Sequence, residues 1–169
     1  MSIRIKLLYI GVSILCFSFP TCQKSSETPK PAGAVYTTWR NLCFDRAAAI
    51  WLIHTFVDST ARFEFLPFGE SVRSGIPLDV PGAELGRQQN KSCFETILQK
   101  YNLDDPQLQN MAKLIHDIDV NTWGPKQLSI SDSLSAFFNT LRETAKDDHQ
   151  LIEQTKPFFQ TLYHSKEFL

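Results

Sequence analysis

Apolar residues recur at the three- and four-residue spacing of an α-helix in several stretches of the chain, which predicts a mainly helical fold. Residues 45–57 are almost entirely apolar and include three successive alanines, so we expect a helix there that is buried on most sides. Ser92 and Glu95 have the spacing of a capping box at the start of a second helix. Asp105 and Pro106 are an N-cap residue and a first-turn proline, which mark the start of a third.

The rest of the pattern predicts two more helices and two short strands. Helical spacing continues over residues 132–152, and a last helix is expected from Pro157. Residues 62–66 alternate between polar and apolar, which predicts a strand. Residues 76–80 alternate as well, but Pro77 has no N–H for a ladder, so this stretch is predicted to be an edge strand. The predicted fold class is therefore mainly α (α+β), a helical domain of about five helices with a small two-stranded insertion.

The first residues have the pattern of an export signal. Arg4 and Lys6 precede an apolar run over residues 7–19, which is short for a membrane-spanning helix. Cys22 follows this run, where a bacterial lipoprotein signal is cut and lipidated. We therefore predict a signal over residues 1–22, lipidation of Cys22, and an exported protein that is membrane-anchored or periplasmic.

Two alternatives to the lipoprotein stay open. Phe19 and Thr21 differ from the residues that usually precede a lipidated cysteine, and plain secretion would remove Cys22 or leave it free. An uncleaved anchor is the third choice. In each case the polar, proline-containing stretch over residues 23–34 is predicted to be a flexible linker, and residues 35–169 the folded domain.

Charge and composition exclude several classes of function. The chain has 17 basic and 18 acidic residues, and removal of the signal would take away two basic residues and no acidic one, so the net charge changes from −1 to −3. A broad nucleic-acid-binding face is therefore not expected. No flavin or nicotinamide fingerprint is present, so no nucleotide cofactor is predicted. Four cysteines without a C-x-x-C pair indicate neither a disulfide scaffold nor a zinc ribbon.

Two groups of polar residues stand out from the helical pattern as candidate sites. Cys43, Asp45 and Arg46 place a thiol, a carboxylate and a guanidinium at the start of the buried helix. His116 and Asp119 are three residues apart on one predicted helix, as a metal pair or an oriented base requires. Simpler interpretations stay open for both. Asp45 can stabilise the helix dipole beside Arg46, and His116 with Asp119 can be an ordinary surface contact.

Asp148 lies on the apolar face of the long predicted helix, where an unpaired carboxylate would be costly to bury. We predict that its partner is Arg46 and that this ion pair fixes how the first helix and the long helix pack. The alternative is a helix break over residues 147–149 that lets Asp148 reach solvent.

Several short blocks match one known family in the same order along the chain. They are residues 45–53, 56–58, 61–63, 76–86, 94–95, 115–119, 147–148 and 162–163. Through these blocks the chain resembles the chromate-resistance proteins of the ChrB C-terminal type over essentially the whole predicted domain. The resemblance implies an exported domain with a role in sensing or resisting chromate, or in handling a related metal species.

The chain departs from the family pattern at three places. Cys43 stands where members carry a histidine, and Arg87 and Gln88 stand where one or two histidines are usual. The family cysteine before Phe-Glu is found at Cys93 instead of at Ser92. If those histidines bind a metal, this protein has lost part of the site or has replaced nitrogen ligands with sulfur.

Two hypotheses follow from the residues and the resemblance together. In the first, a divalent metal, zinc or iron, is bound by thiolate, imidazole and carboxylate ligands, and arginines attract a chromate-like oxyanion. The predicted metal ligands are Cys43, Asp45, Glu84, Glu95, His116 and Asp119, and the predicted anion-binding residues are Arg46 and Arg87. Binding or sensing is favoured over catalysis because the chain has no redox-cofactor motif. In the second, the protein is a degenerate, non-catalytic envelope lipoprotein that acts through protein contacts.

Cys43 and Cys93 are the thiols that remain in a mature chain lipidated at Cys22. They flank family blocks, so we expect them to lie near each other. A disulfide and a shared role as metal ligands both stay open.

Overall fold

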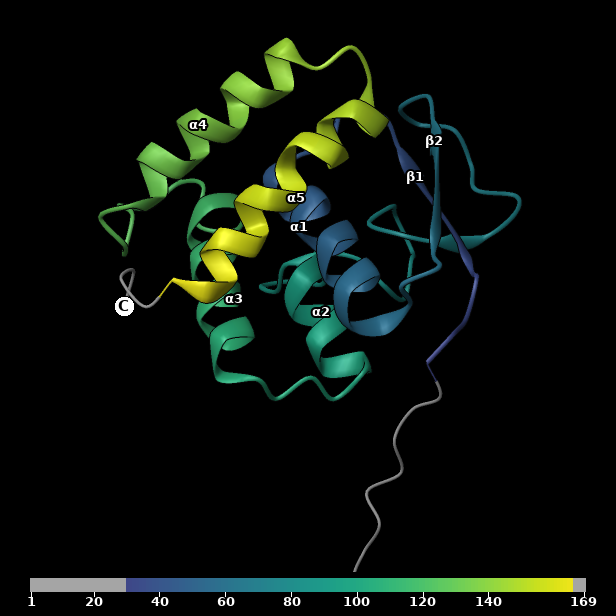
Figure 1. Ribbon diagram of the computed structural model, residues 1–169, viewed down its shortest axis with the longest axis horizontal. Coiled ribbons are helices and arrows are strands. Elements are labelled where there is room, and N and C mark those ends of the chain that lie inside the picture. The colour runs from purple at the N-terminus through teal and green to yellow at the C-terminus, as the bar shows by residue number, and fades with distance from the viewer. Residues whose placement is uncertain (1–29, 166–169) are drawn as a thin grey trace, which may run out of the picture.

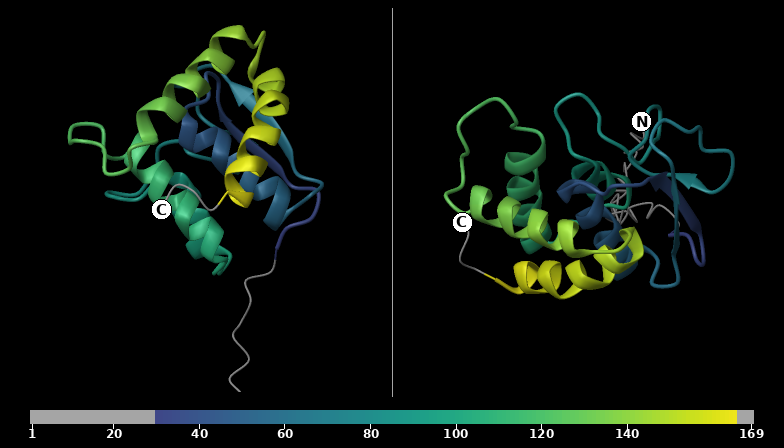
Figure 2. Two further views of the ribbon diagram at one scale, coloured as in Figure 1. Left: turned by 60° about the vertical axis from the view of Figure 1, so that its left-hand side comes forward. Right: turned by 90° about the horizontal axis from the view of Figure 1, so that it is seen from above.

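A parallel three-stranded sheet lies beside a layer of helices (Figures 1 and 2). This computed structural model describes residues 30–165. The strand order is β2-β1-β3, with β1 (Val35–Trp39) in the centre, β2 (Arg62–Leu66) on one side and β3 (Ile76–Pro77) on the other. The predicted signal and the lipidation of Cys22 fall outside the described residues and stay predictions.

The sheet has one strand more than the two that we predicted. The missed strand is β1, which pairs in parallel with both neighbours, so that Tyr36 lies opposite Phe63 and Ile76. Its three central residues are buried, because a central parallel strand is covered on both faces and shows no polar–apolar alternation. The prediction of an edge strand at β3 is confirmed.

The buried helix predicted over residues 45–57 is present and forms the centre of the helical layer. α1 (Phe44–Leu52) contacts α2 (Cys93–Lys100), α3 (Pro106–Asp119) and α5 (Asp148–His164). It continues into η1 (Ile53–Val57), a π-helical segment. The wider turn closes with a hydrogen bond from the Asp58 N–H to the Ile53 carbonyl, 2.8 Å long.

The next two helices begin where their caps predict. Before α2 (Cys93–Lys100), the Ser92 hydroxyl accepts from the Glu95 N–H at 3.1 Å and the Glu95 carboxylate accepts from the Ser92 N–H at 2.7 Å. Asp105 caps α3 (Pro106–Asp119) by accepting from two backbone N–H groups of its first turn. Both caps satisfy donors that a helix start leaves free.

The long helix predicted over residues 132–152 is two helices, so that prediction is wrong. α4 (Ser131–Thr144) ends before Ala145, and α5 (Asp148–His164) turns back beside it (Figure 2). The break forms because Asp147 caps α5 by accepting from the Gln150 N–H at 2.8 Å. The predicted helix start at Pro157 is wrong as well, because this proline lies inside α5.

Aromatic side chains hold α4 and α5 against α1. The ring of Phe44 meets those of Phe138, Phe158 and Phe159 at centroid distances of 5.2, 5.9 and 5.5 Å. Edge contacts at these distances are favourable beyond the burial of area. None of the helices within residues 30–165 has the length and apolar character needed to cross a membrane.

The predicted pair of Arg46 and Asp148 does not form. The helix break places Asp148 at the start of α5, where its carboxylate accepts from the N–H groups of Asn41 and Leu42 at 3.1 Å each. Arg46 instead contacts Asp79. Asp148 still joins the last helix to the start of α1, but through backbone donors and not through a cation.

Replacing Asp148 with alanine should therefore lower the free energy of unfolding by about 2 kcal/mol, because two backbone N–H groups lose a charged acceptor. Urea unfolding of the purified protein measures the change. The matched control is Asp104→Ala, an exposed aspartate, which should change stability by less than about 0.5 kcal/mol. Equal effects of the two substitutions would contradict a bridging role for Asp148.

Candidate functional site

The start of α1 is held by the end of α3. Cys43 occupies the N-cap position but makes no side-chain cap. Asp119 supplies one from a distance, since its carboxylate accepts from the Asp45 N–H at 2.7 Å. Asp119 thus lies beside Cys43 and Asp45 because the first N–H groups of α1 have no acceptor within the helix.

The Asp45 carboxylate lies under this helix start and is fully buried. Its two oxygens accept from the N–H groups of Cys93 and Phe94, at 2.7 and 2.9 Å, so that it also caps α2. Burial raises the pKa of Asp45 to about 7, and the charge of Asp79 adds to the rise, while the two backbone hydrogen bonds act against it. One carboxylate thus orients α2 against α1.

Arg46 is fixed on the chain segment that follows β3. Its guanidinium lies 3.1 Å from the Asp79 carboxylate and also donates to the carbonyls of Trp39 and Asp79. Asp79 has a φ of 47°, a left-handed conformation that aspartate tolerates better than most residues. The close approach of Arg46 and Asp79 was not predicted, although Asp79 lies inside a block that the resemblance marked.

Arg87 lies between two carboxylates. One guanidinium nitrogen is 3.6 Å from Asp45 and 3.7 Å from Asp119, and the other donates to the Asp119 carbonyl at 3.2 Å. Its backbone N–H donates to the Asp79 carboxylate at 3.2 Å. The Arg87 side chain remains 42% exposed, so this cation lies at the opening of the site.

These groups surround a pocket of about 550 Å³. We call it the aspartate pocket and define it by Cys43, Arg46, Asp79, Arg87 and Asp119 in its lining, with Asp45 beneath them. It holds three carboxylates and two guanidinium groups, which leaves one carboxylate in excess. Because burial raises the pKa of Asp45 to about 7, this excess is a net negative charge, which favours a cation, once Asp45 is ionised above about pH 7.

The six predicted metal ligands do not meet in one place. Cys43, Asp45 and Asp119 belong to the aspartate pocket. Glu84 is at the surface, where its carboxylate is 72% exposed and contacts Lys100. Glu95 and His116 lie together in a second pocket. Within residues 30–165, no group of three or more His, Cys, Asp or Glu side chains is arranged to hold a metal ion.

The second pocket, of about 600 Å³, contains a histidine held by a carboxylate. His116 Nδ1 lies 3.0 Å from the Glu95 carboxylate, which also belongs to the capping box of α2. Such a contact orients the imidazole and leaves its other nitrogen available. His116 and Asp119, predicted to share a site, therefore serve two different pockets from one helix.

Asp117 is a buried acid that was not among the predicted site residues. It accepts from the Ser131 hydroxyl at 2.6 Å, from the Asn121 side chain at 3.0 Å, and from the N–H groups of Gln127 and Leu128. These donors come from the loop and the helix start after α3, so its role is structural. Its position on the inner side of α3, one residue from His116, was the available signal.

The two cysteines within the described residues are free thiols. Burial raises the pKa of both thiols, and neighbouring carboxylates add to the rise. These are Asp119 and Asp45 for Cys43, and Asp45 and Asp79 for Cys93. The thiol of Cys93 is fully buried and lies 3.6 Å from the Leu85 carbonyl. Of the two, Cys43 lines the aspartate pocket.

Comparison with known proteins identifies the class to which this fold and pocket belong. The family described as "ChrB, C-terminal domain" matches residues 36–166. Because this match covers most of the chain, the protein belongs to that family.

The chain is also similar to Protein ChrB of Cupriavidus metallidurans (strain ATCC 43123 / DSM 2839 / NBRC 102507 / CH34). The two are 29% identical over 136 residues, which cover 78% of this chain and 40% of that relative. The match thus spans less than half of the relative's length. No solved structure matches the chain.

Proposed function

We propose that this chain is an exported binding or sensing domain of the chromate-resistance type and that its aspartate pocket takes a divalent metal ion. The observation that carries the proposal is the excess of carboxylate over guanidinium in that pocket. The tie to chromate rests on membership of the ChrB C-terminal family and on the similarity to Protein ChrB.

The charge balance favours a metal cation over a chromate-like oxyanion. A dianion would enter a pocket lined by Asp79 and Asp119, and the guanidinium of Arg46 is already bonded to Asp79. A divalent cation would instead neutralise the excess acid. Chromate therefore remains the second ligand to be tested, and it requires both arginines to leave their present partners.

Arg87 occupies the place that a metal would take between Asp45 and Asp119. Its partial exposure allows the guanidinium to turn into solvent, which removes the cation beside Asp45, Asp119 and the Cys43 thiol and leaves the backbone hydrogen bonds of both carboxylates in place. Sulfur and carboxylate oxygen together suit zinc or iron. Family members usually have histidine near this position, and arginine cannot act as a metal ligand at any ordinary pH.

Removing the guanidinium should strengthen metal binding. We expect Arg87→Ala to bind Zn²⁺ or Fe²⁺ at least about tenfold more tightly than the natural protein, because two carboxylates lose a competing cation. Titration calorimetry of the mature protein measures both affinities. The control is Arg142→Ala, at an exposed position on α4, which should leave the affinity unchanged.

Three further outcomes separate the alternatives. Loss of metal binding in Cys43→Ser would support the thiol as a ligand. Binding of chromate by the natural protein, and its loss in Arg87→Ala, would show that the ligand of the pocket is an oxyanion and not a metal ion. Absence of metal and chromate binding in both proteins would favour the second candidate function, a degenerate envelope lipoprotein that acts through protein contacts. The arginine at position 87, which cannot be a metal ligand, is the observation that favours this candidate.

Export and lipidation are tested separately from ligand binding. We expect the mature protein, isolated from the cell that naturally makes it, to begin at a lipid-modified Cys22. Mass spectrometry of the N-terminal peptide detects this modification. A chain that begins at another residue would indicate plain secretion, and a chain that retains Met1 would indicate an uncleaved anchor.

A further inference from the structure

A pocket between the sheet and α5 shares no lining residue with the aspartate pocket. Its volume of about 800 Å³ falls in the range of about 300–1,000 Å³ that small-molecule sites occupy. β2, the end of α1 with η1, and the middle of α5 each supply one wall. We call it the sheet–α5 pocket.

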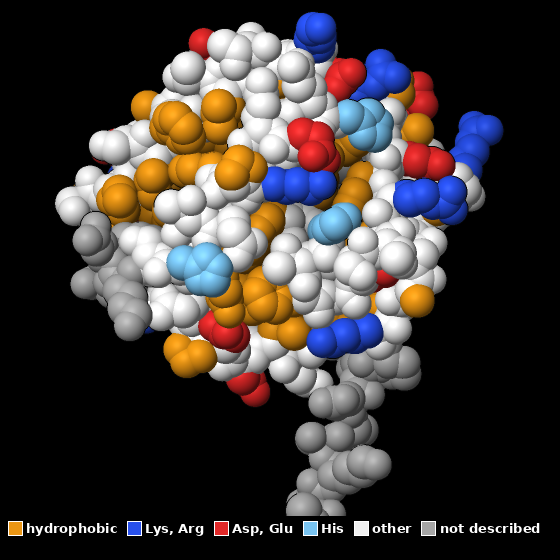
Figure 3. Space-filling view, in the orientation of Figure 1, with side chains coloured by type: hydrophobic (Ala, Val, Ile, Leu, Met, Phe, Trp, Pro, Cys, Tyr) orange, Lys and Arg blue, Asp and Glu red, His pale blue; other side chains and the backbone are white. Residues whose placement is uncertain are grey.

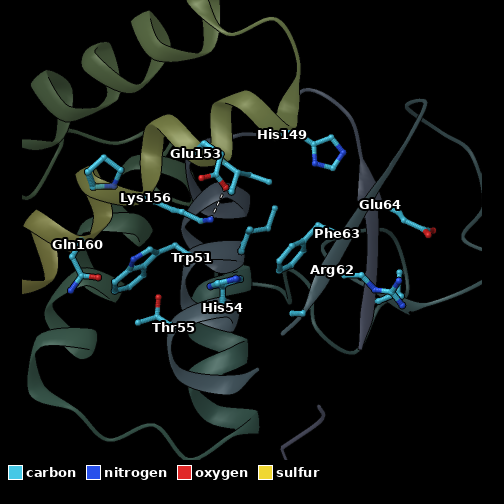
Figure 4. Close-up of a pocket in the computed structure, with 15 residues that line it drawn as sticks. Trp51, His54, Thr55, Arg62, Phe63, Glu64, His149, Glu153, Lys156 and Gln160 are labelled. Carbon is cyan, nitrogen blue, oxygen red and sulfur yellow. Dashed lines mark hydrogen bonds and ion pairs between the residues drawn. The ribbon is translucent and has the colours of Figure 1, made fainter. Parts of the chain in front are cut away.

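The sheet–α5 pocket is lined by apolar side chains together with polar and charged ones. Trp51 and Phe63 face each other across the hollow, with His54 between them (Figure 4). Ile50 and Ile152 add to the apolar part of the lining, with Val35, Ala61 and Pro157. On the same face of the molecule, apolar side chains show through between basic and histidine side chains (Figure 3). An apolar body of a ligand would be well accommodated here.

The polar part of the lining includes two nitrogen groups, on His54 and Lys156, and also Arg62, Glu64 and His149. His54 lies on η1, where the π-helical turn departs from regular α-helix next to the pocket, and such turns are frequent at functional sites. Its imidazole has no hydrogen-bond partner among the described residues. The Lys156 ammonium uses one donor on Glu153, at 2.6 Å, and an ammonium has three.

We infer that the sheet–α5 pocket binds a small amphipathic molecule with an apolar chain and one carboxylate, of the fatty-acid class. The chain lies between Trp51 and Phe63, and the carboxylate accepts hydrogen bonds from Lys156 and His54. This inference does not depend on a metal in the aspartate pocket.

The charge of the ligand follows from the exposures of the two paired residues. The Glu153 side chain is 68% exposed and that of Lys156 is 37% exposed. An exposed ion pair of this kind contributes little, so Glu153 can return to water while a ligand carboxylate takes its place. A cationic ligand would have to displace the less exposed Lys156 from Glu153.

The test uses dodecanoate as the probe and dodecyltrimethylammonium as its cationic counterpart, both below micelle formation, in titration calorimetry with the mature protein. We expect dodecanoate to bind and the cation to bind at least about tenfold more weakly. Lys156→Met keeps the apolar stem and removes the charge, and should weaken dodecanoate binding at least about tenfold. Lys113→Met, at an exposed lysine on α3, is the matched control and should bind as the natural protein does.

A second variant guards against a fold defect. Thr55 is exposed and lines the pocket, so Thr55→Trp should block binding while the melting temperature stays near that of the natural protein. The inference is overturned if dodecanoate does not bind, if the cation binds equally well, or if Lys156→Met has no effect. A concentration-dependent dimer that Thr55→Trp abolishes would also overturn it, because the pocket would then be an interface between two copies.

Discussion

Asp117→Ala is expected to lower the free energy of unfolding by about 3 kcal/mol or more. Asp117 is 3% exposed, and its carboxylate is the common acceptor for the loop between α3 and α4 and for the Ser131 hydroxyl at the start of α4. Alanine would leave these buried donors without an acceptor, which costs far more than the bonds themselves contribute.

The pH dependence of this loss gives a second check. Burial alone would raise the pKa of Asp117, but the hydrogen bonds from Ser131, Asn121 and the backbone outweigh it and hold the pKa well below its usual range. A lowered pKa stabilises the folded state above the unfolded pKa, and that contribution is lost as the pH falls through the acid range. The difference between Asp117→Ala and the natural protein should therefore shrink in acid.

Urea unfolding at neutral and acid pH measures both effects. Glu143→Ala, on the exposed side of α4, serves as the control and should change stability by less than about 0.5 kcal/mol at either pH. A loss below about 1 kcal/mol for Asp117→Ala would mean that water replaces the lost acceptor.

Asp45 should give the opposite pH dependence. Burial and the charge of Asp79 raise its pKa in the folded protein to about 7, from an ordinary value of 3.8. Between these two values the folded state holds a proton that the unfolded state has released, so the stabilisation present below about pH 4 is lost as the pH rises towards 7.

Asp45→Asn removes this titration and keeps the shape of the side chain. We expect the natural protein to lose about 2–4 kcal/mol relative to Asp45→Asn between pH 4 and pH 8, measured by urea unfolding in the presence of a metal chelator. Asp104→Asn, at an exposed position, should show a difference that does not vary with pH. A constant difference for Asp45→Asn as well would show that Asp45 is ionised throughout.

The helices were predictable where the signal was local. The capping box of Ser92 and Glu95 and the Asp105-Pro106 start both depend on residues within one turn, and both formed as predicted. The break between α4 and α5 was only the alternative prediction, because apolar spacing continues across it, although Asp147 carried the signal of a cap. β1 was missed because a strand covered on both faces has no alternation.

The site was predictable only in part, for the same reason. Cys43, Asp45 and Arg46 are neighbours in sequence and were predicted as one group. Asp119 and Arg87, which were also predicted site residues, lie beside this group in the structure. Asp79 was missed because its contact with Arg46 joins residues 33 positions apart. The i, i+3 spacing of His116 and Asp119 did not bring them to one ligand, because His116 contacts the Glu95 carboxylate in one pocket and Asp119 accepts from the Asp45 backbone N–H in the other.

The bridge from Asp148 to the loop before α1 has a consequence for how the chain acquires its structure. Its two hydrogen bonds join residues that are 107 and 106 positions apart in the sequence. The helices α2, α3 and α5, which contact α1, all follow α1 in the sequence. Contacts of such long range form slowly, because the chain loses the entropy of closing large loops before the contacts stabilise it. We therefore expect the apolar surface of α1, although this helix is made early, to stay exposed until the last helix has been made. Folding would then be a single late event and not a stepwise growth from the amino terminus.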